Sequence, residues 1–411
     1  MDRLPSGWRK TSLSKVAVIQ TGIAKGGKLP QDAVELPYLR VANVQDGYLD
    51  LSEMKTLHLE RRLVDRYALQ VGDVLLTEGG DHDKLGRGTV WYGEIPVCLH
   101  QNHVFAVRCD RTQVLPEFFA LQAASPYGKK YFLNCAKRST NLASINKSQL
   151  SEYPILFPPL PEQRKIAEIL GAWDAASGRV EQLIAALQRR KQGLMQRLLT
   201  GAVRFPEFGG TEWEELRLGE FLRYAPRKVE KPASSYVRMG IRSHGKGTFT
   251  EIIDDPTSNA MDFLYEVKGD DLIVNITFAW EQAIAIVDAK DAGALVSHRF
   301  PTYEFDRTKV VSEFFRYLML TERFHDKLEL ITPGGAGRNR VMSKPDFLKL
   351  TVRVPSVKEQ QRIGEVLMAN DKAIDTYQQY LAALSQQKKG LMQRLLTGQV
   401  RVKVDSVTPA A

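Results

Sequence analysis

The sequence predicts an α+β protein that is an internal duplication: two mixed α/β domains are joined by two long helices, which form an antiparallel coiled coil about a pseudo-twofold axis. Three observations lead to this fold class. The nine residues GLMQRLLTG at 193–201 recur at 390–398. Between 162 and 204, 24 of 43 residues are identical to those 197 positions later. Apolar residues in both copies follow a heptad spacing, which is typical of paired helices.

A fainter similarity continues upstream of the repeated segment, with small changes of offset. Trp8 matches Trp213, GDVLL at 72 matches GDDLI at 269, and PEFF at 116 matches SEFF at 312. Self-similarity at a fixed interval indicates repeated structural units. The predicted domains are a first variable domain (1–157), a first helix (158–201), a second variable domain (202–354), a second helix (355–398) and a tail (399–411).

The variable domains alternate short β-rich runs with glycine-rich turns. DVLLT, VFAVR, DLIVNITFAW and AIAIV have the composition of strands, and a helical stretch follows each EFF. This alternation favours a mixed α and β fold in both variable domains.

The repeated segments are predicted to be helices of about 38 residues, on the order of 57 Å long. Pro161 suits a first helical position, Ser356 and Glu359 have capping-box spacing, and Gly201 and Gly398 are stop signals. An isolated apolar seam of this length needs a partner, and the other copy is the obvious one. The seam residues are Ile166, Leu170, Trp173, Val180, Ile184, Leu187, Leu194, Leu198, Ile363, Leu367, Ile374, Tyr377, Leu381, Leu384, Leu391 and Leu395.

Two pairs of repeated residues interrupt the apolar pattern. Lys191 and Lys388 occupy equivalent seam positions, and Gly193 and Gly390 lie inside the predicted helices. They mark places where the seam opens or another subunit approaches; alternatively, the lysines extend to solvent and the glycines are only tolerated.

Composition restricts the function classes. The chain has 411 residues and a formal charge of +9, which is compatible with a polyanionic partner. Its three cysteines, Cys98, Cys109 and Cys135, all lie in the first half, which favours a reducing cytoplasm. We expect no membrane span, because no apolar run approaches about 20 residues, and no signal peptide, because the start MDRLPSGWRK has no apolar core.

Four possible chemical signals are weak. GIRSHGKG at 240–247 lacks the hydroxyl residue of a phosphate-binding loop, and TFTEII after it reads as a strand. CLHQNH at 98–103 contains possible metal ligands, but a strand would point them to opposite faces. Acidic-x-Lys triplets have no convincing acidic partner upstream, and FPPLP lacks the residues with which adenine methyltransferases hold a flipped base. We therefore expect no metal, no cofactor and no catalytic residue in this chain.

The arrangement resembles the specificity subunit of type I restriction-modification systems. The resemblance covers essentially the whole chain and depends on two unlike domains, each followed by a helix that PLPEQ or PSVKEQ introduces and LMQRLLTG closes. It implies that the variable domains are target recognition domains, each reading half of a bipartite DNA site, and that the helices set the spacing. It also implies two modification subunits, which bind S-adenosylmethionine and methylate adenine, and restriction subunits, with ATP and magnesium on these partners.

Independent readers on a rigid spacer would recognise two different half-sites, because phosphate contacts position a protein while base contacts specify sequence. Basic and amide residues on glycine-rich loops are the candidate DNA contacts, although such loops are also common as solvated turns. The candidates are Lys84, Arg87, Lys137, Arg138, Asn141, Arg242, His244, Lys246, Arg338, Asn339 and Arg340.

Three alternatives remain open. The chain could be the specificity subunit of a related methyltransferase-nuclease system, an enzyme with an unrecognised active site, or a coiled-coil scaffold that binds only proteins. Divergence between the two variable domains argues against the scaffold, and a salt-dependent affinity for DNA would exclude it.

Overall fold

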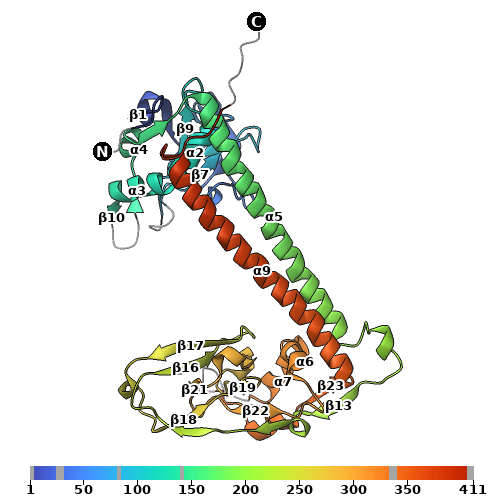
Figure 1. Cartoon of the computed structure of the whole chain (residues 1–411). Coiled ribbons are helices and arrows are strands. Elements are labelled where there is room, and N and C mark those ends of the chain that lie inside the picture. Colours follow the sequence, from blue (N-terminus) through green and yellow to red (C-terminus); the bar gives the residue numbers. More distant parts are fainter. Residues whose placement is uncertain (1–3, 25–31, 81–84, 139–142, 333–339, 405–411) are drawn as a thin grey trace. The chain divides into compact units, whose positions relative to one another are not determined.

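The computed structural model describes residues 4–24, 32–80, 85–138, 143–332 and 340–404. The chain divides into two compact units. Unit 1 contains Met1–Glu181 and Gln379–Ala411, and unit 2 contains Gln182–Gln378. Two long helices, α5 (Leu160–Leu198) and α9 (Val357–Leu395), each contribute one half to each unit (Figure 1). The two helices predicted from the heptad spacing are therefore confirmed.

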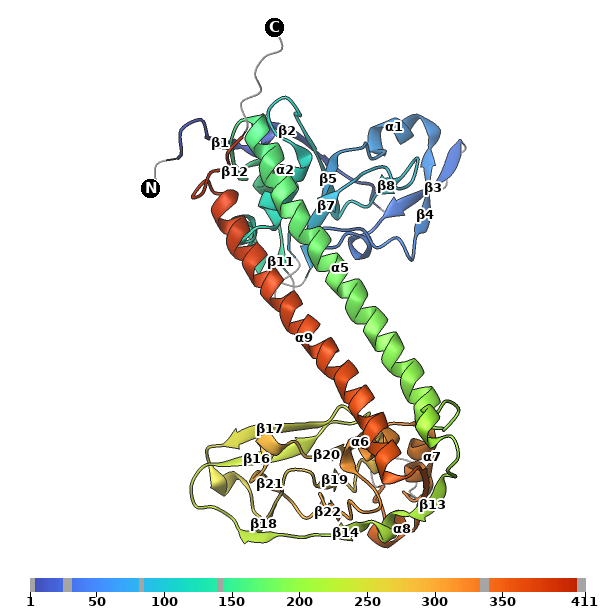
Figure 2. The ribbon, with the colours of Figure 1, turned by 45° about the vertical axis from the view of Figure 1, so that its right-hand side comes forward.

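In unit 1, the first variable domain contains three small sheets. The sheet orders are β2-β9-β5-β7, β4-β3-β8 and β10-β11-β6, and a separate antiparallel pair joins β1 to β12. Figure 2 shows α2 beside α5, with the β4-β3-β8 sheet farther from the helix than β5 and β7. The elements are β1 (Arg9–Ser12), β2 (Ala17–Thr21), β3 (Ala33–Leu39), β4 (Lys55–Glu60), α1 (Val64–Tyr67), β5 (Asp73–Thr77), β6 (Gly79–Gly80), β7 (Gly88–Val90), β8 (Leu99–His100), β9 (Val104–Cys109), α2 (Pro116–Ala124), α3 (Pro126–Cys135), β10 (Lys137–Arg138), β11 (Ala143–Ser144), α4 (Lys147–Ser151) and β12 (Pro154–Phe157).

Unit 2 repeats this plan with a larger outer sheet. The orders are β14-β22-β19-β20 and β15-β18-β21-β16-β17, and β13 pairs with β23 as β1 pairs with β12. The elements are β13 (Glu214–Arg217), β14 (Leu222–Tyr224), β15 (Lys228–Glu230), β16 (Tyr236–Ile241), β17 (Thr248–Ile253), β18 (Phe263–Glu266), β19 (Leu272–Val274), β20 (Ile284–Ile286), β21 (Leu295–Val296), β22 (Thr302–Phe305), α6 (Ser312–Leu318), α7 (Glu322–Leu330), α8 (Lys344–Lys349) and β23 (Thr351–Val354). The strand predicted for TFTEII is confirmed as β17.

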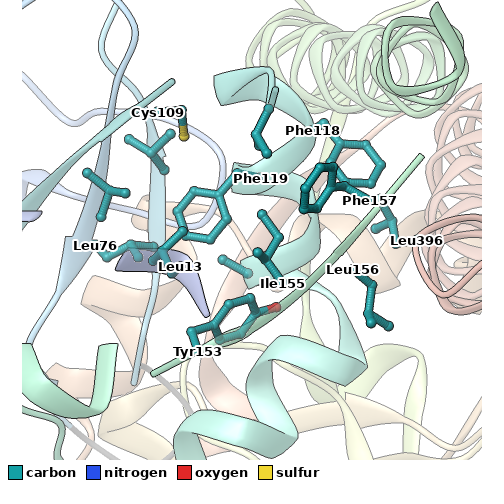
Figure 3. Packing of buried hydrophobic residues seen from close by; sticks show 14 of the residues in the cluster. Leu13, Leu76, Cys109, Phe118, Phe119, Tyr153, Ile155, Leu156, Phe157 and Leu396 are labelled. Carbon is teal, nitrogen blue, oxygen red and sulfur yellow. The ribbon is translucent and has the colours of Figure 1, made fainter. Parts of the chain in front are cut away.

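Each unit uses the start of one long helix and the end of the other to complete its core. In unit 1, Phe118 of α2 and Phe157 of β12 are buried in one cluster with Ile166 of α5 and Leu396 after α9. Figure 3 shows Leu396 close to Phe157 and Phe118. Unit 2 repeats the arrangement, with Phe314, Val354, Leu198 and Ile363 in one cluster. Burial of this apolar area, worth about 25 cal/mol per Å², holds the helices to the variable domains.

The Glu-Gln pair at the start of each helix makes equivalent contacts in the two units. Glu162 accepts two hydrogen bonds from Arg401, at 2.6 and 2.7 Å, within unit 1. Glu359 accepts two from Arg204, at 2.9 and 2.5 Å, within unit 2. An arginine that follows the end of one helix therefore binds the first turn of the other, with the fork geometry that suits a carboxylate.

The neighbouring glutamines bind the backbone that leads into the helices. Gln163 accepts from Leu115 N–H at 2.8 Å and donates to the carbonyls of Gln113 and Pro158 at 2.7 and 2.8 Å. Gln360 makes the same three contacts with Val311, Lys309 and Pro355, at 3.0, 2.9 and 2.9 Å. Both glutamines are fully buried, so these bonds satisfy groups that water cannot reach.

The helices run antiparallel within each unit. In unit 1, Lys388 of α9 forms an ion pair with Asp174 of α5, and Arg401 after α9 binds Glu162 at the start of α5. Later residues of α9 therefore lie beside earlier residues of α5. In unit 2, Lys191 lies 2.6 Å from Asp371 and Asn370 donates to Leu187 O at 3.2 Å. The antiparallel pairing is confirmed within each unit, and the two seam lysines have acidic partners on the opposite helix.

Helix ends follow the predicted glycine rule, but the predicted capping box is wrong. Gly201 and Gly398 have φ of 73° and 76°, the left-handed conformation that glycine adopts without strain. Gly201 N–H and Gly398 N–H donate to Leu198 O and Leu395 O at 3.4 Å, which is the shorter bond of a Schellman ending. Val203 N–H and Val400 N–H reach back six residues to Arg197 O and Arg394 O. The Glu359 carboxylate binds Arg204 instead of the backbone at Ser356, because the arginine supplies a charged fork.

All the predicted seam residues are buried or half-buried in the structure. Those nearest the helix ends, such as Leu170 and Leu367, also pack into the variable-domain cores. Which seam residues pair with one another stays a prediction, as do the domain boundaries. Among the residues that the structure describes, no helix is long and apolar enough to cross a lipid bilayer.

Candidate nucleic-acid interface

In the first variable domain, the two stretches with predicted DNA contacts are attached to one short sheet. Strand β5 leads through Glu78 into β6, which pairs with β11, and β11 pairs in turn with β10. Gly79 therefore lies opposite Ser144, and Ser144 lies opposite Lys137. The chain segments that flank 81–84 and 139–142 are thus hydrogen-bonded neighbours, although they are about 60 positions apart in the sequence.

Glu78 holds this short sheet in place. Its N–H donates to His103 O and its carbonyl accepts from Ile145 N–H, both at 2.9 Å. Its carboxylate lies 2.5 Å from His103 Nδ1. Sequence reasoning placed His103 in a weak metal-ligand set and did not select Glu78. Within the described part of the chain, no three His, Cys, Asp or Glu residues gather in a way that could hold a metal ion.

The individual candidates in this domain have different outcomes. Arg87 is half-buried and donates to Val41 O at 3.3 Å, so part of its guanidinium is already used inside the domain. Lys137 and Arg138 form β10, but their side chains are not described. Lys84 and Asn141 lie outside the described residues.

In the second variable domain, the turn 276–282 after β19 contacts the first predicted loop and Arg340 of the second, and we call it the anchor of these segments. The first loop, RSHGKG, binds its end: His244 N–H donates to Glu281 O at 2.6 Å, and Gly245 N–H donates to Gln282 O at 3.0 Å. Ser243 Oγ donates to the Glu281 carboxylate at 2.6 Å. His244 and Gln282 have φ of 61° and 53°, a left-handed backbone that costs energy outside glycine.

Arg340, the one described residue of the second loop, GGAGRNR, lies against the same turn. The guanidinium of Arg340 lies 5.1 Å from the centre of the Trp280 ring, within cation–π distance. Met342 N–H donates to Ile276 O at 2.8 Å, and His325 Nε2 lies 2.7 Å from Trp280 O. Arg340 also lies 3.7 Å from Glu329. Arg338 and Asn339 lie outside the described residues.

The other candidates of the first loop lie on its exposed side. Lys246 and the side chain of His244 are exposed. Arg242 is exposed too, but it donates to Thr248 O at 2.5 Å and lies 5.0 Å from the Phe249 ring, so it belongs to the β16–β17 hairpin. The backbone of RSHGKG therefore contacts the turn 276–282, whereas its basic side chains point away from these contacts.

The two variable domains share one geometric principle. The anchors follow β5 and β19, the strands of the GDVLL and GDDLI segments that the sequence comparison aligned. Each anchor joins described residues of two basic stretches from distant parts of its domain, and three of the four stretches contain glycine. Glycine lets a backbone approach a ligand closely, and arginine, lysine and asparagine supply the donors that phosphates and base edges accept.

The buried thiols and the buried histidine take no part in these anchors. Burial raises the pKa of the Cys98 and Cys109 thiols to about 12, so they stay protonated and unreactive. His100 is fully buried, its Nδ1 lies 2.7 Å from Val104 O, and burial lowers its pKa. These groups belong to the core of the first variable domain.

Comparisons with known proteins agree with this arrangement. Residues 5–189 match the family model described as the type I restriction modification DNA specificity domain. A protein of Methanocaldococcus jannaschii described as the MjaX type I restriction enzyme specificity subunit is 25% identical, over 97% of this chain and 95% of its own. The MjaVIII specificity subunit of the same organism is 25% identical over 67% of this chain and 68% of its own.

Solved structures with the same fold cover nearly the whole chain. The S subunit of a type I restriction-modification system from M. genitalium has a TM-score of 0.56 at 14% identity, over 96% of this chain and 97% of its own. The HsdS subunit of Thermoanaerobacter tengcongensis has a TM-score of 0.52 at 17% identity, over 97% and 99%.

Proposed function

We propose that this chain is the DNA-recognition subunit of a type I restriction-modification complex, which the match of residues 5–189 to the specificity-domain model and the 25% identity to the MjaX specificity subunit support. Each variable domain reads one half of an asymmetric, two-part site in double-stranded DNA, and the paired helices set the gap between the halves. The observation that carries this proposal is that the described ends of two basic stretches meet after β5, and that RSHGKG and Arg340 meet at the turn after β19.

The anchors suit reading better than they suit catalysis. The described carboxylates at the anchors are already paired, Glu78 with His103 and Glu281 with Ser243. The exposed side chains of His244 and Lys246 offer donors of the kind that phosphates and base edges accept. Net charge of +9 favours association with a polyanion. Two dissimilar readers then imply an asymmetric target, because each set of loops presents different donors to the base edges.

Chemistry belongs to partner subunits in this proposal. Two modification subunits, which bind S-adenosylmethionine, and restriction subunits, which use ATP and magnesium, assemble on the helices and the adjoining domains. The chain by itself binds no cofactor and neither methylates nor cleaves DNA.

Mapping methylated adenines tests the proposal directly. The chain is co-expressed with its modification subunit in a host without other adenine methylation, and the genome is sequenced for modified bases. We expect one asymmetric two-part motif with a fixed gap, and DNA affinity of the purified chain that falls steeply with salt. Methylation by the chain alone would favour an enzyme, and salt-independent failure to bind DNA would favour a protein scaffold.

Arg340 gives a sharper test within one half-site. Arg340→Ala should weaken DNA binding by about 1–3 kcal/mol and relax only the half-site read by the second variable domain. Arg340→Lys keeps a charge over Trp280 but loses the planar fork, so specificity should relax with a smaller loss of affinity. Arg353→Ala, an exposed arginine on β23, is the matched control. Unchanged affinity and an unchanged methylated motif in both Arg340 variants would remove this residue from the site.

A further inference from the structure

A groove of about 990 Å³ lies in unit 1 between α2, the first half of α5 and the end of α9. Its floor and walls include Leu121 of α2, Gly171, Asp174 and Gly178 of α5, and Lys388 of α9. Neither anchor described above contributes to it. We call it the α2–α5 groove.

In unit 2, a tyrosine fills the equivalent corner. Tyr317 of α6 is 1% exposed, and its hydroxyl donates to Asp371 of α9 at 2.7 Å. Its ring centre lies 5.4 Å from the ammonium of Lys191, which is itself paired with Asp371. Ring, carboxylate and ammonium thus form one closed cluster where the variable domain meets the helices.

Unit 1 has the carboxylate and the ammonium of this cluster but not the ring. In the 197-residue repeat, Asp174 of unit 1 corresponds to Asp371 of unit 2, and Lys388 of unit 1 corresponds to Lys191 of unit 2. Asp174 and Lys388 form the same ion pair as their equivalents. Aligning PEFFALQ with SEFFRYL places Leu121 where Tyr317 stands. The Asp174 side chain is 55% exposed, against 33% for Asp371, as expected where no ring covers it.

The wall formed by α5 leaves room for an incoming side chain. A Cβ added at Gly171 or at Gly178 would meet no atom within 4 Å. The equivalent positions on α9 are Met368 and Asp375, which are larger. Glycine inside a helix costs about 1 kcal/mol against alanine, so both glycines weaken the helix while opening the groove.

The lining of the groove favours a protein over DNA. Five carboxylates line it, from Asp46, Glu117, Glu168, Asp174 and Glu181, together with four cations, from Lys129, Arg164, Lys388 and Lys389. Asp46 is paired with Lys129 and Asp174 with Lys388, so the groove offers no cationic excess to a phosphate backbone. Tyr48 and Tyr92 also line it, each with 61% of its surface exposed. Exposed aromatic residues around a concave surface are typical of protein–protein interfaces.

We infer that the α2–α5 groove is a docking site for a protein partner that inserts a tyrosine side chain, in the way Tyr317 occupies the equivalent corner of unit 2. The incoming hydroxyl donates to Asp174 and the ring packs beside Lys388 and Leu121. The inference rests on the proposed function for the identity of the partner, which is the modification subunit. The two units therefore present different surfaces to their partners, one corner open and the other already filled.

Filling the groove from within tests this inference on the full-length chain. Leu121→Tyr supplies the missing ring, and Gly178→Phe occupies the open wall. Both should weaken, at least tenfold, the binding of the modification subunit that docks on unit 1, so calorimetry should show one of the two binding events weakened and the other unchanged. Leu121→Met and Gly178→Ala are the matched controls and should bind within twofold of the wild type. Affinity for a DNA duplex carrying the methylated motif, measured in parallel without the partner, should not change in any variant.

The outcomes separate the inference from the proposed function. Wild-type affinity in both filling variants would overturn the docking site, and a loss of DNA affinity with intact subunit binding would assign the groove to nucleic acid instead. Failure of the wild-type chain to bind either the modification subunit or DNA would overturn the proposed function itself. A photo-crosslinker at position 121 should join a tyrosine-containing peptide of the modification subunit, and a peptide without tyrosine would overturn the assignment of the inserted side chain.

Discussion

A fragment of residues 1–205 should form a homodimer that directs methylation to an inverted repeat of the first half-site. Unit 1 completes its core with the end of α9, where Leu391, Met392, Leu395 and Leu396 pack and Arg401 binds Glu162. Residues 194–204 match 391–401 at ten of eleven positions, the exception being Ala202 for Gln399. The end of α5 in a second copy can therefore supply the same contacts, and twofold symmetry imposes a symmetric target.

Charge exchange tests whether the fragment dimerises in this way. In the fragment, Arg204→Glu should abolish dimerisation by placing two carboxylates together, and adding Glu162→Arg to the same chain should restore it. Sizing of the complex with the modification subunit, followed by mapping of methylated DNA, gives both readouts. Trp173 for Asn370 and Ser177 for Ile374 are the seam differences that the dimer must accommodate. A monomeric fragment, or one that still directs methylation to an asymmetric site, would contradict the account of two readers on one spacer.

Gln360→Leu should destabilise unit 2 by about 3 kcal/mol or more, and Gln163→Leu should do the same in unit 1. Each change leaves one N–H and two carbonyls, all buried or part-buried, without their partner, and each buried unsatisfied group costs about 1–3 kcal/mol. The leucine has a similar volume, so the loss reports on hydrogen bonds more than on packing.

Denaturant unfolding checks this prediction, and the chain offers a neighbouring control. Gln361 is exposed, so Gln361→Leu should change the free energy of unfolding by less than about 0.5 kcal/mol. Two units need not unfold together, so the transition should be followed by a probe in each unit. Equal stability of the Gln360→Leu and Gln361→Leu variants would show that the glutamine contacts contribute nothing measurable.

The two long helices could be predicted from the sequence because their spacing and their ends follow local rules. A 4-3 spacing of apolar residues persists over nearly forty residues, and glycine at 201 and 398 ends each helix with a positive φ. The same rules misassigned Glu359, because its partner Arg204 is 155 positions away and no spacing reveals it. Likewise, the acidic partners of Lys191 and Lys388 are visible only once the antiparallel register is known.

The candidate site was predicted as separate loops, and the structure shows why their gathering was not foreseen. β6 and β11 have two residues each, too short to carry a period-two pattern. In the second variable domain, the contact between the RSHGKG loop and the turn 276–282 needs a left-handed backbone at His244 and Gln282. A histidine or a glutamine in a sequence does not predict this conformation, whereas a glycine often does. The repeated GDVLL and GDDLI segments were the available signal, since both anchors follow them.

The discontinuity of unit 1 has a consequence for biosynthesis. Unit 2 is one uninterrupted stretch, whereas unit 1 joins the first 181 residues to the segment that begins at 379. A ribosome adding 5–20 residues per second takes roughly 10–40 s to make the intervening 200 or so residues. Until Leu395 and Leu396 emerge, the apolar surface around Phe118 and Phe157 lacks its cover. The part of the protein that is synthesised first is therefore completed last, and it is the part most exposed to aggregation and to chaperones on the way.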